Sequence, residues 1–224
     1  CANAGARPHP GRMSAAPFAV LKTAGLCFAY PQRTLFTNWD CAIPTGITLL
    51  QGDESTGKTT LLRLLAGEQH AQSGRLHCGG VWLDEEPKLY REQVFRTDPR
   101  AEDSESITPM QFLARLAPRY PRLDMALGKE MVDGLSLTGH MDKPLYMLST
   151  GSRRKVWLLA AFAAGATVTL LDEPFAALDA KSIAFVHELL QETAAHPNRA
   201  WVVADYTAPQ GVPLAHTIAL TDLP

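Results

Sequence analysis

The chain has little cysteine and no hydrophobic run long enough to cross a membrane. Four cysteines among 224 residues are too few for a disulfide framework, and none stands in a CxxC pair or at metal-ligand spacing from a histidine. We therefore expect free thiols in a reducing compartment. The uncharged stretch 156–171 is shorter than the ~20 apolar residues of a spanning helix. The sequence accordingly predicts a buried helix and a buried strand there, and no transmembrane span.

An excess of charge of either sign is also absent. Lys and Arg number 21 and Asp and Glu number 23, which gives a formal net charge of −2. This balance excludes a protein whose main work is neutralising phosphate backbones, so we expect no nucleic-acid partner. Hydrophobic residues at 46% supply a core, and the length suits one large domain or one domain with an inserted lobe. Residues 1–12 are expected to be a disordered extension without a signal peptide, which makes Met13 a candidate start.

The order of apolar segments and turn residues predicts an α/β chain. Short apolar segments broken by prolines and a glycine over residues 20–47 indicate antiparallel strands, and a compact strand follows over 47–51. A helix with its leucines on the core side is expected over 59–66, and a short strand over 94–96. Residues of about 100–150 are expected to form a helical lobe.

The helical lobe carries a helix-start signal. Thr108 is expected to cap a helix that has Pro109 at its first position and Gln111 completing a capping box, and Pro118 ends that helix. Beyond the lobe the α/β pattern resumes. The expected elements are a helix from residue 152, a strand over 168–171, a helix over 180–195, a strand over 201–204 and a short apolar segment at 218–220.

Residues 52–59 read GDESTGKT and match the GxxxxGK[ST] phosphate loop, between the strand and the helix that such a loop requires. In such a loop backbone N–H groups surround the β-phosphate, a lysine reaches the β- and γ-phosphates, and a hydroxyl binds Mg²⁺. Lys58 and Thr59 are expected to take the last two roles. The expected nucleotide-binding residues are Gly52, Asp53, Glu54, Ser55, Thr56, Gly57, Lys58, Thr59 and Thr60.

Two carboxylates, Asp172 and Glu173, follow the buried strand 168–171. Taken alone, a solvated strand end is the better explanation for them. Together with a phosphate loop they predict phosphoryl chemistry, in which Asp172 holds Mg²⁺ through water and Glu173 polarises the attacking water. Glu173 and Lys58 are therefore candidate catalytic residues.

Residues 148–152 read LSTGS and are followed by three consecutive cations at a predicted helix start. The helix dipole disfavours positive charge at that end, which suggests that an anion arrives from outside. The alternative is a plain helix cap with solvated basic residues, and from this segment alone the alternative is the better explanation.

In their order along the chain, these motifs resemble those of the nucleotide-binding subunit of an ABC transporter, and the resemblance covers nearly all of residues 17–220. It rests on GDESTGKTT, LSTGS, LLDEP and the sequence Ala177-Leu178-Asp179, with Leu148 standing 24 positions before Asp172 as in the family. The resemblance implies an α/β P-loop NTPase fold with a mostly parallel core sheet, an N-terminal antiparallel β lobe and an inserted helical lobe. The implied division is one ATPase domain at 13–224, with its core at 13–98 and 151–224 and the helical lobe at about 99–150.

The resemblance also implies an ATPase that uses ATP and Mg²⁺ and powers transport through a separate membrane-spanning permease subunit. Two cassettes, identical or different, would close head to tail, so that Ser149 and the Gly151 N–H of one complete the γ-phosphate contacts of the other. Such a subunit is peripheral and lies on the cytoplasmic face of the membrane. A translation or DNA-repair ATPase is disfavoured, because the chain has neither paired cassettes nor a long coiled-coil insert.

One further position adds to the resemblance, and two depart from it. Tyr30 falls where the family keeps an aromatic that stacks on adenine, although a strand-core aromatic is the alternative. Asp98 stands where the family has a Gln that senses Mg²⁺, and Asp205 where it has a His that holds the γ-phosphate. A carboxylate repels phosphate unless a metal or a proton intervenes.

Asp98 is therefore assigned, with Thr59 and Asp172, to the metal site, and Asp205 to the catalytic groups. We expect these two substitutions to slow hydrolysis. The alternative function is a catalytically weak nucleotide-binding regulatory partner in an asymmetric ABC assembly.

Overall fold

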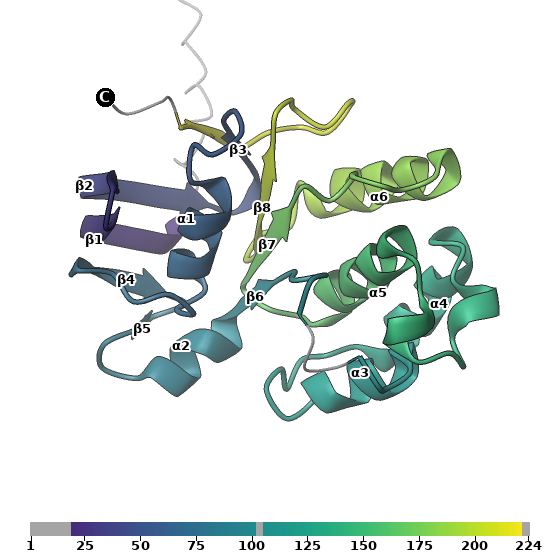
Figure 1. Cartoon of the computed structure of the whole chain (residues 1–224). Helices are drawn as coiled ribbons and strands as arrows, with labels where there is room; N and C mark the ends of the chain where they lie inside the picture. The colour runs from purple at the N-terminus through teal and green to yellow at the C-terminus, as the bar shows by residue number, and fades with distance from the viewer. Residues whose placement is uncertain (1–18, 102–104, 221–224) are drawn as a thin grey trace, which may run out of the picture.

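Two sheets and a set of helices make up the described part of the chain, residues 19–101 and 105–220 of a computed structural model (Figure 1). The expected extension at 1–12 and the candidate start at Met13 lie outside these residues. No helix within the described ranges combines the length and the apolar character needed to cross a bilayer. Cys27, Cys41 and Cys78 are free thiols.

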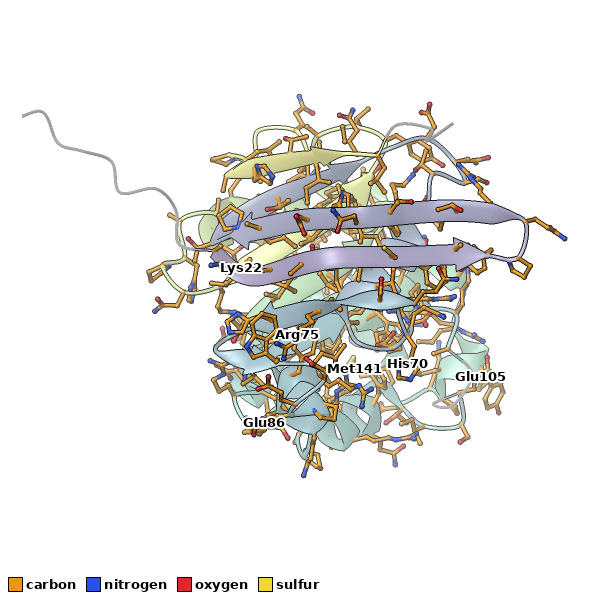
Figure 2. The ribbon with its side chains drawn as sticks, turned by 90° about the vertical axis from the view of Figure 1, so that its left-hand side faces the viewer. Lys22, His70, Arg75, Glu86, Glu105 and Met141 are labelled. Atoms are coloured by element: carbon orange, nitrogen blue, oxygen red, sulfur yellow. The ribbon has the colours of Figure 1, made fainter. Side chains whose placement is uncertain are left out.

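The first sheet is antiparallel and has the strand order β2-β1-β4-β5. Its strands are β1 (Ala19–Tyr30), β2 (Arg33–Pro44), β4 (Ser73–Cys78) and β5 (Val81–Trp82). Figure 2 looks onto this sheet, with Lys22 on β1 and Arg75 on β4. The expectation of antiparallel strands over 20–47 is confirmed, because β1 and β2 form a long hairpin.

The second sheet is parallel and has the order β6-β7-β8-β3-β9. Its strands are β6 (Val94–Arg96), β7 (Val168–Asp172), β8 (Ala200–Asp205), β3 (Gly46–Gln51) and β9 (His216–Ala219). Its central strands read as nearly continuous apolar runs because both faces of the sheet are buried. Four of the five strands were located approximately from the sequence, β6 to the residue, while β9 was expected only as a short apolar segment at 218–220.

The two faces of the parallel sheet pack against different neighbours, because successive side chains along a strand point to opposite sides. On β8, Trp201 and Val203 belong to the core shared with the helical region, while Val202 and Ala204 belong to the core shared with α1 and the antiparallel sheet. Helix α1 (Lys58–Leu65) accordingly lies between the two sheets (Figure 1). Helices α5 (Thr150–Ala163) and α6 (Ala180–Thr193) lie on the other side of the parallel sheet.

The helical region contains α3 (Pro109–Leu116), α4 (Met125–Gly134) and two single 3₁₀ turns, Thr138–His140 and Leu145–Met147. The predicted capping box at the start of α3 is present. The Thr108 hydroxyl accepts a hydrogen bond from the Gln111 N–H, and the Thr108 N–H donates to Gln111 Oε1 at 2.9 Å. Sequence patterns predict no element over residues 68–93, which form β4, β5 and the short helix α2 (Pro87–Gln93).

Candidate nucleotide-binding site

The phosphate loop connects β3 to α1 at the carboxyl end of the parallel sheet, where open α/β sheets bind their ligands. Gly57 precedes the first residue of α1 with φ +98°, a left-handed conformation that a side chain would strain. The first turn of α1 contains no acidic residue, so its free N–H groups remain available to an anion. The loop therefore has the geometry that its sequence predicts for phosphate.

Lys58 is almost fully buried, at 6% exposed, and its ammonium group is held inside the loop. Nζ donates to the carbonyl oxygen of Gly52 at 2.6 Å and to that of Asp53 at 2.9 Å. These neutral carbonyls are weaker partners for an ammonium group than phosphate oxygens are. The arrangement leaves Lys58 poised to exchange its loop contacts for a phosphate.

The carboxylate motif, Asp172 and Glu173, contacts the phosphate loop directly. The Thr59 hydroxyl donates to Asp172 Oδ2 at 2.7 Å, across 113 positions of sequence. Strand β7 pairs with β6 on one side and β8 on the other, which fixes Asp172 at its end. Glu173 follows with φ +45°, an uncommon conformation for a residue with a side chain, and its N–H donates to the Ala204 carbonyl.

A cleft of about 470 Å³, called the nucleotide cleft below, lies over the phosphate loop. Its lining residues are Tyr30, Arg33, Leu35, Asp53, Glu54, Ser55, Gly57, Lys58, Thr59, Thr60, Arg100, Glu173 and Tyr206. Tyr30 is 45% exposed, and its hydroxyl lies 3.1 Å from Thr60 Oγ1. Tyr30 therefore does not sit in the strand core, and its contact with adenine stays a prediction.

The donor set around Thr59 fits Mg²⁺. Within the described residues, no group of three or more His, Cys, Asp or Glu side chains is arranged to hold a metal ion. The Thr59 hydroxyl and the Asp172 carboxylate nevertheless offer the few hard oxygen ligands that Mg²⁺ takes from a protein when phosphates and water supply the rest.

Asp98 lines a small cleft together with Thr59 and Asp172, but its carboxylate has a cationic partner. Arg96 donates from Nη2 to Asp98 Oδ2 at 2.6 Å and from Nε to Glu68 Oε2 at 2.6 Å. Burial acts to lower the pKa of Arg96, and the two carboxylates more than reverse that effect. The charge of Asp98 is therefore balanced within the chain, and its role as a metal ligand stays a prediction.

The structure places Tyr206, the residue after β8, in the nucleotide cleft where the sequence pointed to Asp205. Asp205 Oδ1 accepts a hydrogen bond from the Tyr206 N–H at 2.7 Å, and Asp205 is not among the described residues that line the cleft. The assignment of Asp205 to the catalytic groups stays a prediction. Tyr206 was not identified from the sequence, although its position just after a parallel strand, at the edge where open α/β sheets bind ligands, was a signal that could have identified it.

Arg33 and Arg100 were also missed. Arg33 donates from Nη1 to the Ser55 carbonyl of the phosphate loop at 2.6 Å. Arg100 follows the predicted strand 94–96 by four positions and lines the cleft next to Glu173. Neither belongs to a motif, so only the fold brings them to the site.

The LSTGS segment caps α5. Ser149 Oγ accepts a hydrogen bond from the Ser152 N–H at 3.2 Å. A Cβ at Gly151 would overlap the carbonyl oxygen of Ala177, so only glycine allows this close approach. Ser149 and Gly151 are not among the described residues that line the nucleotide cleft. Their predicted contact with a nucleotide therefore needs a second chain.

The three cations at the start of α5 have partners in the same chain. Arg153 Nη1 lies 2.7 Å from Glu105 Oε1, and Lys155 forms an ion pair with Asp179. Arg154 Nη1 donates to the Ala176 carbonyl at 2.5 Å. The expectation that an anion arrives to neutralise them is not needed to explain their position.

Comparison with known proteins agrees with this geometry. The ABC transporter family matches residues 38–176. The cytochrome c biogenesis ATP-binding export protein CcmA of Pseudomonas savastanoi pv. phaseolicola is 32% identical over 171 residues, which cover 76% of this chain and 79% of that protein. The protein of the same name from Pseudomonas fluorescens is 29% identical over 185 residues, 82% of this chain and 86% of its own. A solved ATP-binding subunit of an ABC transporter superposes with a TM-score of 0.73 at 21% identity, covering 83% of this chain and 79% of that one.

Proposed function

This chain belongs to the ABC transporter family as an ATP-binding subunit, and we propose that it hydrolyses ATP to drive transport through a separate membrane-spanning permease. The observation that carries the proposal is the 2.7 Å contact between Thr59 and Asp172, which joins the phosphate loop and the carboxylate motif in one site. The relatives are named export proteins, which supports export as the direction.

The residues of the site divide the hydrolytic step among them. Mg²⁺, when bound by Thr59 and Asp172, supplies positive charge to the β- and γ-phosphates. Lys58 exchanges its two loop carbonyls for phosphate oxygens. Glu173 accepts a hydrogen bond from the attacking water, whose oxygen bonds to the γ-phosphorus as the bond to the bridging oxygen breaks. The products are ADP and inorganic phosphate.

We propose that a second cassette, identical or different, completes the site. Ser149 is exposed at the start of α5, outside its own chain's nucleotide cleft, which supports a role toward a partner's nucleotide. By the family resemblance, the assembly is peripheral on the cytoplasmic face of the membrane, with the helical lobe facing the permease. The same resemblance supports one ATPase domain over 13–224 with its lobe at about 99–150.

Slow hydrolysis, or a regulatory role beside a competent partner, is the second candidate. The observation in its favour is that two aspartates, Asp98 and Asp205, stand where the family has Gln and His. The carboxylate of Glu173 in the cleft argues against it. Turnover by the chain alone and by the chain assembled with its permease separates the two.

The test of the proposed function is Lys58→Ala. Loss of one charge-assisted contact to phosphate costs about 1.5–3 kcal/mol, so the affinity for MgATP should fall roughly ten- to hundredfold in calorimetry. The matched control is Lys22→Ala, which removes an equal charge from the exposed face of the antiparallel sheet (Figure 2). Equal MgATP affinity in both variants would show that the loop does not bind nucleotide.

A further inference from the structure

A second, smaller cleft lies beside the nucleotide cleft and is lined by four arginines. They come from four different segments: Arg63 from α1, Arg96 from the end of β6, Arg100 from the loop that follows, and Arg154 from α5. The volume is about 160 Å³. We call it the arginine cleft.

The nucleotide cleft and the arginine cleft share lining residues at the proposed site of hydrolysis. Thr59, Arg100 and Glu173 line both of them, and Asp172 lines the arginine cleft. Arg63 stands four residues after Thr59 on α1, which puts both side chains on one face of that helix. The arginine cleft therefore opens where a γ-phosphate held by Lys58 and Thr59 would separate from ADP.

Three of the four arginines have hydrogen-bond donors that are available to a ligand. Arg63 and Arg100 form no ion pair with any residue in the described ranges, and Arg154 Nε is buried without a partner there. Burial and the nearby charge of Arg100 lower the pKa of Arg154, while Glu173 and Asp172 act to raise it. Arg154 is thus a partly desolvated cation close to Glu173 and Asp172. Arg96 is the exception, because its guanidinium group already forms ion pairs with Glu68 and Asp98.

We propose that the arginine cleft receives the inorganic phosphate released by ATP hydrolysis while ADP is still in the nucleotide cleft. The inference rests on the proposed function. Guanidinium groups present paired N–H donors that match phosphate oxygens. At roughly 30 Å³ for each water, the cleft holds the equivalent of a few waters, which suits one tetrahedral oxyanion and excludes a nucleotide. Three carboxylates also line it, which keeps the phosphate weakly held and able to leave.

The test measures binding of inorganic phosphate to the full chain saturated with MgADP, by calorimetry at constant ionic strength in chloride. Wild type should bind phosphate without losing ADP. Arg63 lies on the exposed side of α1 and lines only the arginine cleft. Arg63→Gln should therefore lower the affinity for inorganic phosphate roughly tenfold and leave the affinity for ADP within about twofold of wild type. Arg100→Gln should weaken phosphate similarly. Lys88→Gln, which removes one charge from the exposed start of α2, is the control and should change neither.

Three results overturn the proposal: phosphate does not bind the MgADP-loaded chain, it binds Arg63→Gln as tightly as wild type, or it displaces ADP. Displacement of ADP would mean that phosphate occupies the phosphate loop instead. ADP affinity measured in the same series, with Lys58→Ala alongside, reports separately on the proposed function. A chain that binds ADP but not phosphate refutes the arginine cleft alone.

Discussion

The ring of Tyr206 covers the ammonium group of Lys58, with Nζ 4.3 Å from the ring centroid. Gln51 holds the backbone of Tyr206 in place by donating from Nε2 to its carbonyl at 2.9 Å. The Tyr206 hydroxyl reaches to 3.4 Å from Glu54 Oε1 in the phosphate loop. The residue after β8 therefore contacts the phosphate loop, and its ring adds a cation–π contact to the two carbonyl contacts of Lys58.

This contact leads to a prediction about the residue after β8. Tyr206→His removes the ring that covers Lys58 and offers an N–H donor to a γ-phosphate oxygen, so the rate of ATP hydrolysis should rise roughly fivefold or more. Asp205→His is the variant for comparison. Because the Asp205 carboxylate accepts a hydrogen bond from its neighbour's N–H outside the cleft lining, we expect this variant to change the rate less than about twofold. Steady-state turnover decides. If the rate of ATP hydrolysis rises in Asp205→His alone, Asp205 is the residue that faces the γ-phosphate.

Tyr30 offers a test of base stacking. Tyr30→Ala should weaken ATP and GTP alike, because a π-face stacks on any base and such stacking is worth about 1–3 kcal/mol. Tyr30→Trp should be nearly neutral for both nucleotides. Calorimetry with each nucleotide gives the affinity, and thermal melting gives the stability. Unchanged affinity in Tyr30→Ala with a lowered Tm would assign the ring to packing against Phe28, 5.0 Å away between centroids.

Local patterns were enough to predict most elements of the fold. The capping box at Thr108 and the apolar strands β3, β6, β7 and β8 each carry their signal within a few neighbouring residues. Residues 68–93 gave none, because β4 is largely exposed and β5 has only two residues. Such strands are specified by the sheet that they join, and β4 is held by its pairing with β1.

The candidate site, too, could be predicted only where local sequence patterns encode it. Motif spacing predicts Lys58, Thr59 and Asp172 as site residues, and in the structure a hydrogen bond joins Thr59 to Asp172. Asp205, the last residue of β8, was named from the sequence and Tyr206 beside it was not identified, because a sequence does not show which of two adjacent side chains turns into a cleft. The arginine cleft gathers side chains from four segments, so no local pattern predicts it.

Glu173 is the group placed to polarise the attacking water, so Glu173→Gln should bind ATP and stop turnover. The amide keeps the size of the side chain but cannot take up a proton, and general-base loss costs roughly 10²–10⁴-fold in rate. The expected product is an ATP-loaded dimer, detected by size-exclusion chromatography with bound-nucleotide analysis. Asp53→Asn, another carboxylate of the cleft lining, is the control that should keep turnover. Full turnover in Glu173→Gln would show that a group other than Glu173 acts as the general base.

Asp179 ties α6 to α5 in two ways. Its Oδ1 accepts a hydrogen bond from the Ser182 N–H at 2.9 Å, which caps α6, and its other oxygen pairs with Lys155. The Lys155 side chain is 8% exposed, while that of Asp179 is half exposed. The Lys155 ammonium and the Ser182 N–H hold the pKa of Asp179 well below its usual range. A depressed carboxylate pKa adds stability above the unfolded-state value, and that stability is lost as the pH falls through the folded-state value.

Two substitutions at Asp179 separate the cap from the ion pair. Asp179→Asn keeps the cap and leaves the buried Lys155 unpaired, which should lower the free energy of unfolding by about 1–2 kcal/mol at pH 7 after allowance for the solvent around Asp179. Asp179→Ala loses the cap as well and should cost about 1 kcal/mol more. Urea unfolding measures both. Because protonation removes the wild-type charge, the gap between wild type and Asp179→Asn should close as the pH falls below about 4. A gap that stays constant from pH 7 to pH 3 would mean that the carboxylate charge contributes nothing and that Lys155 is stabilised by packing alone.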